Sequence, residues 1–130
     1  MTYYYAKTIA RPFDEVVAAT REALSLEGFG VITEVDVRQT MKAKIGEDFR
    51  PYLILGACNP RLAFEALQLE DKVGIMLPCN VIIQDAGDGR TEVAAVDPVA
   101  SMAAIENDGL KQKAAIVGEK LRAAIDRIGG

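Results

Sequence analysis

The chain has 130 residues, half of them hydrophobic and 26% charged, with 15 basic and 19 acidic side chains and a net charge of −4. A chain of this size and composition is expected to form one globular domain over residues 1–130, which argues against a disordered or fibrous protein. The acidic balance and the lack of a Lys/Arg cluster argue against nucleic-acid binding, because that function needs basic side chains beside phosphates. No nucleic-acid partner is therefore expected.

The first half of the sequence shows patterns of both strands and helices. Tyr and β-branched residues predict a strand over residues 2–9, and the apolar spacing after it predicts a helix from Phe13 to a stop at Gly28. Asp36 is expected to cap a short helix that Gly46 ends. Two further strands are predicted in this half, over residues 30–35 and 51–57.

The second half contains two places where a capping residue precedes a proline, Asn59-Pro60 and Asp97-Pro98. Each predicts the start of a short helix. Two strands are predicted in this half. They are residues 74–84, interrupted or bulged at Pro78-Cys79-Asn80, and residues 90–96, which follow a glycine-rich hairpin loop.

The end of the chain gives the clearest helical pattern. An apolar seam with alternating steps of four and three residues predicts one long helix. The seam consists of Leu110, Ala114, Val117, Leu121, Ala124 and Ile128. We interpret it as a helix packed on a sheet, with a dimer contact as the alternative. The fold expected is a two-layer α+β fold with a mainly antiparallel sheet, β-α-β4-α core topology, short helical insertions and a long C-terminal helix.

The sequence contains no histidine. This excludes Ser-His-Asp and Cys-His catalytic arrangements, zinc catalysis by histidine ligands and histidine-ligated haem. Any general base would have to be Asp, Glu, Lys, Tyr or a thiolate. The sequence does not say whether any reaction is catalysed.

The first residues of the sequence lack the basic and apolar regions of a signal peptide, and no apolar run reaches the roughly 20 residues of a membrane span. We therefore expect a cytoplasmic protein with no membrane partner. In that compartment the two cysteines are expected to be reduced thiols.

Both cysteines belong to Cys-Asn dipeptides, which lie 21 residues apart at Cys58-Asn59 and Cys79-Asn80. If the strands that carry them are neighbours, the two dipeptides converge at one end of the sheet. A disulfide between them would require Cα atoms within about 7 Å of each other.

Six segments of the sequence together resemble the DUF302 family, and the resemblance covers nearly the whole chain. They are Val35-Asp-Val, Gly46, Asp48-Phe-Arg-Pro-Tyr52, Leu55-Gly-Ala-Cys-Asn-Pro60, Leu77-Pro-Cys-Asn80 and Asp97-Pro98. The resemblance implies a TATA-binding-protein-like β-α-β4-α topology with short added helices, and a homodimer. It implies no activity, since the function of the family is undescribed, and a topology named after a DNA-binding protein does not imply DNA binding.

Cys58 has the stronger chemical argument of the two cysteines. A helix that begins at Asn59-Pro60 would place Cys58 next to free amide donors and the positive end of a helix dipole, which stabilise a thiolate. Arg61 would add to this effect and lower the pKa from about 8.5 toward about 7. Burial would raise the pKa, and the alternative interpretation is a small buried residue at a strand end.

Four further residues are candidates for the site. Asn59 and Asn80 are interpreted either as cap and turn residues or as amides that orient a ligand. Arg50 and Tyr52 are interpreted either as anion-binding groups near Cys58 or as part of a surface loop with a salt bridge. For Cys79, a regular bulge that closes the sheet is the alternative to a functional thiol.

Three functions are compatible with these residues. The first is a homodimeric module that binds a small ligand at a site lined by the two Cys-Asn motifs. The second is a thiol-based redox or sulfur-transfer protein in which Cys58 reacts and Cys79 resolves, although no C-x-x-C motif is present. The third is metal or cluster binding by four cysteines across a dimer interface. No cofactor can be named from these residues.

Overall fold

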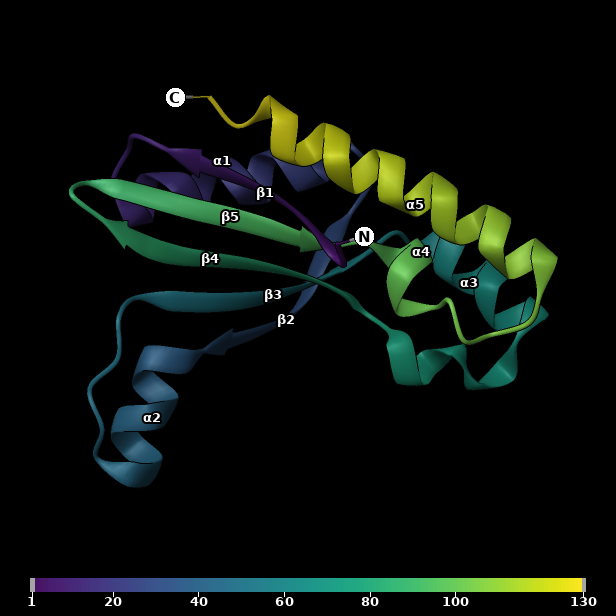
Figure 1. Ribbon diagram of the computed structural model, residues 1–130, viewed down its shortest axis with the longest axis horizontal. Coiled ribbons are helices and arrows are strands. Elements are labelled where there is room, and N and C mark those ends of the chain that lie inside the picture. Colours follow the sequence, from purple (N-terminus) through teal and green to yellow (C-terminus); the bar gives the residue numbers. More distant parts are fainter. Residues whose placement is uncertain (1, 130) are drawn as a thin grey trace.

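The computed structural model describes residues 2–129, which form one five-stranded sheet with the strand order β1-β5-β4-β3-β2 (Figure 1). Every neighbouring pair of strands is antiparallel. The strands are β1 (Tyr4–Ile9), β2 (Gly30–Asp36), β3 (Tyr52–Cys58), β4 (Cys79–Gly87) and β5 (Arg90–Val96). The predicted α+β class with its β-α-β4-α core is confirmed.

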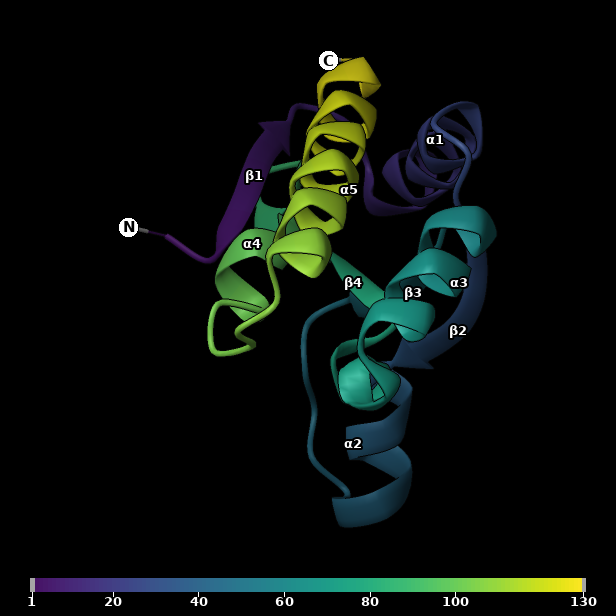
Figure 2. The same ribbon diagram turned by 90° about the vertical axis from the view of Figure 1, so that its right-hand side faces the viewer.

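The helices differ in length and in how they meet the sheet. The two long ones are α1 (Phe13–Leu26) and α5 (Asp108–Arg127), which lie side by side over one face (Figures 1 and 2). The short ones are α2 (Val37–Ile45), α3 (Pro60–Leu69), the 3-10 helix η1 (Asp71–Met76) and α4 (Pro98–Ser101). Three short helices were predicted, and η1 is the additional one.

The main core lies between the sheet and the two long helices. Alternate residues of each strand point to this covered face because side chains alternate along a strand. The buried members include Ile9, Leu55, Ile83 and Val93 from the strands and Val16, Leu24, Leu121 and Ile125 from the helices. The predicted seam of the last helix is confirmed, with Ile128 buried just after the helix ends.

The caps predicted at Asp36 and Asp97 are both present. The Asp36 carboxylate accepts a hydrogen bond from the Gln39 amide at 3.0 Å, and Gly46 ends α2 with a φ of 70°. The Asp97 carboxylate likewise accepts from the Val99 amide at 3.0 Å. These side chains satisfy amide groups that have no partner within the helix.

The strand predicted over residues 74–84 is wrong in its first part. Residues 71–76 form η1, the Leu77-Pro78 peptide is cis, and β4 begins at Cys79 without an interruption. Val73 is fully buried and anchors η1, whereas Ile75 is 79% exposed. A short apolar run fits both a strand and a helical turn, and here residues 71–76 form the helical turn.

The opposite, open face of the sheet carries an apolar row across all five strands. The cross-strand neighbours in this row are Val35, Ile54, Ile82, Ala94 and Ala6. Helix α2 projects away from the sheet, on the side opposite α5, and contains no buried residue (Figures 1 and 2). The molecule therefore has one face covered by its own helices and one face open.

Candidate functional site

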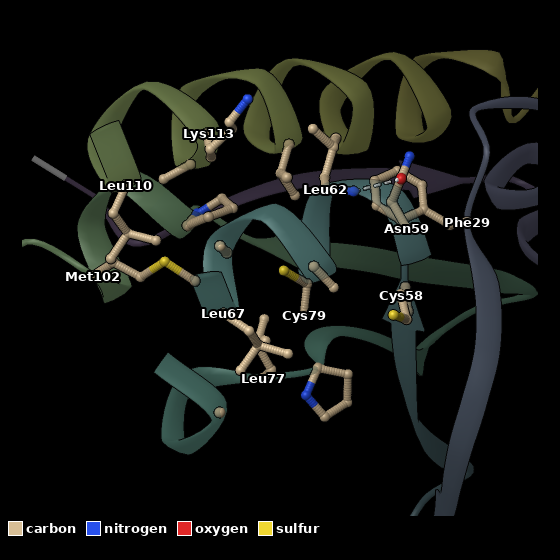
Figure 3. Close-up of a pocket in the computed structure, with 18 of the residues that line it drawn as sticks. Phe29, Cys58, Asn59, Leu62, Leu67, Leu77, Cys79, Met102, Leu110 and Lys113 are labelled. Atoms are coloured by element: carbon tan, nitrogen blue, oxygen red, sulfur yellow. Dashed lines mark hydrogen bonds between the residues drawn. The ribbon is translucent and has the colours of Figure 1, made fainter. Parts of the chain in front are cut away.

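A cavity of about 340 Å³ lies between the end of the sheet and the helices α3, α4 and α5 (Figure 3). Helix α3 contributes Leu62 and Ala66 to its wall, and α5 contributes Leu110 and Ala114. The floor includes Ala57 at the end of β3. The cavity thus forms where two helices and a sheet end meet.

The cavity lies between two separate clusters of buried side chains. Ala57 belongs to the main core, whereas Ala66, Ala114, Met102 and Leu110 belong to a smaller cluster under α3 and α4. Alanines from both clusters line the cavity, and their short side chains do not reach across it. The cavity exists because these wall positions carry alanine, whereas other core positions carry Leu or Ile.

The first Cys-Asn dipeptide forms part of the cavity wall. The Asn59 side chain accepts a hydrogen bond from the Leu62 amide at 3.3 Å, and Pro60 is the first residue of α3. The predicted cap is therefore confirmed. Cys58 is the last residue of β3 and is half-buried, and it lines the cavity together with Asn59.

Cys79 lies in the same wall, on the strand next to Cys58. It pairs with Ala57 across β3 and β4 and is only 6% exposed. Burial raises the pKa of the Cys79 thiol to about 11, with a smaller contribution from Cys58. The Cys79 side chain is therefore a neutral thiol at pH 7 and adds a largely apolar surface to the cavity.

The second Cys-Asn dipeptide is divided between the two faces of the sheet. Asn80 pairs with Gly56, is exposed and does not line the cavity. Because neighbouring side chains in a strand point to opposite faces, the Asn80 side chain points away from the face that carries Cys79. The cap at Asn59 has no counterpart at Asn80.

The remaining predicted residues lie away from the cavity. Tyr52 begins β3, at the end opposite Cys58, and the Arg50 guanidinium donates a hydrogen bond to the Gln84 side chain at 2.8 Å. Arg50 also lies over the Phe49 ring, 4.5 Å from its centroid. Arg61 is exposed on α3 and is not among the lining residues. The structure brings together Cys58, Asn59 and Cys79 from the predicted set.

An ion pair between α3 and α5 was not predicted. The Lys113 ammonium lies 2.7 Å from a carboxylate oxygen of Glu65, and Lys113 lines the cavity. The hydrogen bond from Lys113 is the largest of the effects that lower the pKa of Glu65. Lys113 lies outside the apolar seam that predicts the last helix, so the sequence pattern does not place it at the cavity. Its contact with α3 in the structure does. Ala114, one of the two alanines in that seam, was the available signal for a cavity.

Residues 2–129 contain no group of three or more His, Cys, Asp or Glu side chains that could hold a metal ion. None of the helices in this range is long and apolar enough to cross a membrane.

The fold and the cavity define a class of small two-layer α+β domain with an apolar site at one end of its antiparallel sheet. The model of the family described as domain of unknown function DUF302 matches residues 5–128, and the chain belongs to that family. The crystal structure of an uncharacterised conserved DUF302 protein from Bacillus stearothermophilus is similar, with a TM-score of 0.91 and 27% identity. That similarity covers 98% of this chain and 99% of the other.

No curated protein matches the chain. The comparisons therefore establish the family and the fold. The expected likeness to the TATA-binding protein stays a prediction.

Proposed function

We propose that the chain is a ligand-binding module that holds one small apolar molecule in the cavity beside Cys58, Asn59 and Cys79. The observation that carries this proposal is the cavity itself. Its volume of about 340 Å³ lies within the range of about 300 to 1,000 Å³ that is usual for small-molecule sites. Apart from Asn59 and Lys113, the described lining residues are apolar side chains, glycine and the two thiols.

The state of Cys79 favours binding over thiol chemistry. A thiol with a pKa of about 11 is almost entirely protonated at pH 7, whereas a nucleophile or a metal ligand is the thiolate. Cys79 is also 6% exposed within its own chain. Sharing a metal with a second chain would require this thiol to reach an interface from a buried position.

The open face of the sheet supports the second part of the proposal, that two copies of the chain form a homodimer. Val35 is 44% exposed in the apolar row, and Tyr4 is 45% exposed on the same sheet. Helix α2 has nine residues and none is buried, although isolated helices shorter than about 12 residues are marginal in water. A second copy placed against this face would cover both features.

Charge supports the same arrangement. Helix α2 contains three basic side chains, Arg38, Lys42 and Lys44, and no acidic one. Since the whole chain has a net charge of −4, the rest of the chain carries −7. The basic α2 of one copy is therefore attracted to the acidic body of the other.

Binding is tested with the neutral apolar dye N-phenyl-1-naphthylamine, whose fluorescence rises in an apolar site. We expect saturable binding to the wild-type protein, and loss of binding in Ala63→Phe, which fills the cavity from the half-buried Ala63 of α3. Ala115→Phe is the matched control, because Ala115 is exposed on α5 and does not line the cavity. Equal dye binding by both variants would contradict the proposal.

A further inference from the structure

We propose that the cavity takes the hydrocarbon chain of a free single-chain amphiphile, such as an alkyl or acyl chain, and leaves the polar end of that molecule in water. This inference rests on the proposed function and names the chemical class of its ligand. The shape of the cavity, the pairing of its polar groups and the nature of its mouth lead to this class.

The lining residues are arranged along an elongated path. Met102 and Leu110 lie at one end and Phe29 and Asn59 at the other, with Cys79 between them (Figure 3). The two ends belong to different buried clusters, since Phe29 is part of the main core and Met102 and Leu110 part of the smaller one. An elongated space that joins two clusters fits a chain better than a compact ring system.

Two polar groups of the lining already have partners within the chain. The Asn59 carbonyl oxygen accepts from the Leu62 amide, and the Lys113 ammonium is paired with Glu65. The Lys113 nitrogen also points away from the two thiols (Figure 3). A polar end brought inside would lose its water and meet mainly apolar side chains, which lowers affinity. The buried part of the ligand is therefore hydrocarbon.

The mouth of the cavity has an apolar rim. Ile32 and Leu67 line the cavity and yet are 61% and 42% exposed. Ile75 and Met76, which follow the lining residue Gly74 in η1, are 79% and 41% exposed. Exposed apolar side chains around a dry site are typical of binding surfaces. We call the two exposed lining residues Ile32 and Leu67 the apolar lip, and a chain that leaves the cavity would pass over it.

The volume sets an expected chain length. A water-sized group occupies about 30 Å³ in the liquid, and a methylene group is of similar size. A cavity of about 340 Å³ then holds roughly ten such groups. Affinity is expected to rise with chain length up to this limit and to level off beyond it.

The test is displacement of N-phenyl-1-naphthylamine by a series of n-alkanols and n-alkanoates, from butyl to tetradecyl. Each alkanol is kept below its solubility limit and each alkanoate below its critical micelle concentration. We expect affinity to rise about fourfold per methylene, since burying one contributes about 0.8 kcal/mol, and to level off near about ten carbons. Alcohols and carboxylates of equal length are expected to bind alike because the polar end stays in water.

A cavity-filling variant sharpens the test. Ala114→Leu adds three carbon atoms to the wall, so the length at which affinity levels off is expected to fall by about three carbons. Ala66→Leu makes the same change from α3 and serves if the first variant does not fold. Ala115→Leu is the control on the exposed side of α5 and is expected to keep the wild-type length.

The outcomes separate this inference from the proposed function. If cyclohexanol and naphthol displace the dye as well as decanol does, and chain length has no effect, the inference is wrong while the binding module stands. If the dye itself does not bind in the cavity, both fail.

Discussion

The two faces of the sheet are built from the same five strands, yet only one is covered. On the covered face, Leu55 and Ile83 are fully buried under the helices. On the open face, their sequence neighbours Ile54 and Ile82 form part of a row that the chain itself leaves half-buried. The difference arises because side chains alternate along a strand while the long helices pack on one side.

The comparison shows which sequence neighbours can share a site. Cys79 and Asn80 lie within a strand and point to opposite faces, so one lines the cavity and the other faces away from it. Cys58 and Asn59 lie where β3 ends and α3 begins, and both line the cavity. Two residues that are adjacent in the sequence can therefore line the same site at the end of a strand.

The largest effect is expected for truncation on the covered face. Ile83→Ala removes a fully buried side chain, and this change typically lowers the free energy of unfolding by about 2 to 5 kcal/mol. Ile82→Ala is the matched change on the open face, with an expected loss of about 1 kcal/mol or less at a protein concentration that keeps the chain monomeric. Urea unfolding of both variants measures the difference. Equal losses would mean that the two faces are equally buried.

The next effect concerns the pH dependence of stability. The pKa of the Cys79 thiol is raised from 9.0 to about 11 in the folded chain. Between these values the unfolded chain has released the proton that the folded chain keeps, so stability is fully present below pH 9 and falls as the pH rises. The loss is about 1.4 kcal/mol per pH unit, and about 2 to 3 kcal/mol in total.

Urea unfolding at pH 8 and pH 11 measures this loss, with Cys79→Ala as the reference. The wild-type protein should lose more stability than the variant, since the other groups titrate in both. If the two proteins lose the same amount, Cys79 is not buried as a neutral thiol.

Because the proposed dimer forms through the open face, a substitution there should weaken association more than a substitution on the helical side. Ile82→Lys places a charge in the centre of the apolar row, and a central interface residue contributes about 2 kcal/mol or more, so the dimer dissociation constant should rise about 30-fold or more. Sedimentation velocity measures it. Ile116→Lys, at an isoleucine that is 41% exposed on α5, should leave association unchanged. A wild-type protein that is monomeric throughout would remove the dimer proposal.

The smallest effect distinguishes the two asparagines. Asn59→Ala removes the cap of α3, which is expected to cost about 1 kcal/mol of stability. Asn80→Ala changes an exposed side chain on the open face, and the expected change is within about 0.5 kcal/mol. Thermal unfolding of both variants measures the two losses of stability. A larger loss for Asn80→Ala would contradict the assignment of Asn59 as the asparagine that stabilises the fold.

Much of the fold was predictable because its signals are local. Cap residues at Asp36, Asn59 and Asp97 and the apolar seam of α5 each specify an element within a few residues. The exception was η1, where the short apolar run Gly74–Leu77 fits both a strand and a helical turn. Only the burial of Val73 against the smaller cluster decides between them.

The site was predictable only in part because it depends on pairing between strands. The register Ala57 opposite Cys79 brings the two thiols to one end of the sheet, as expected if their strands were neighbours. The same register sends Asn80 to the open face and leaves Tyr52 at the far end of β3. Residues such as Met102 and Lys113 enter the site through packing of α4 and α5, which no motif marks.

Methyl NMR of the alanines under xenon tests the central claim most directly, because xenon binds dry apolar cavities. Alanines occur both in the cavity wall and on the open face. Those in the wall are Ala57, Ala63, Ala66 and Ala114, and those in the open row are Ala6 and Ala94. We predict that xenon shifts the methyl signals of the first group and leaves those of the second unchanged. Shifts confined to the second group, or the absence of shifts in the first, would contradict a ligand cavity on the covered side of the sheet.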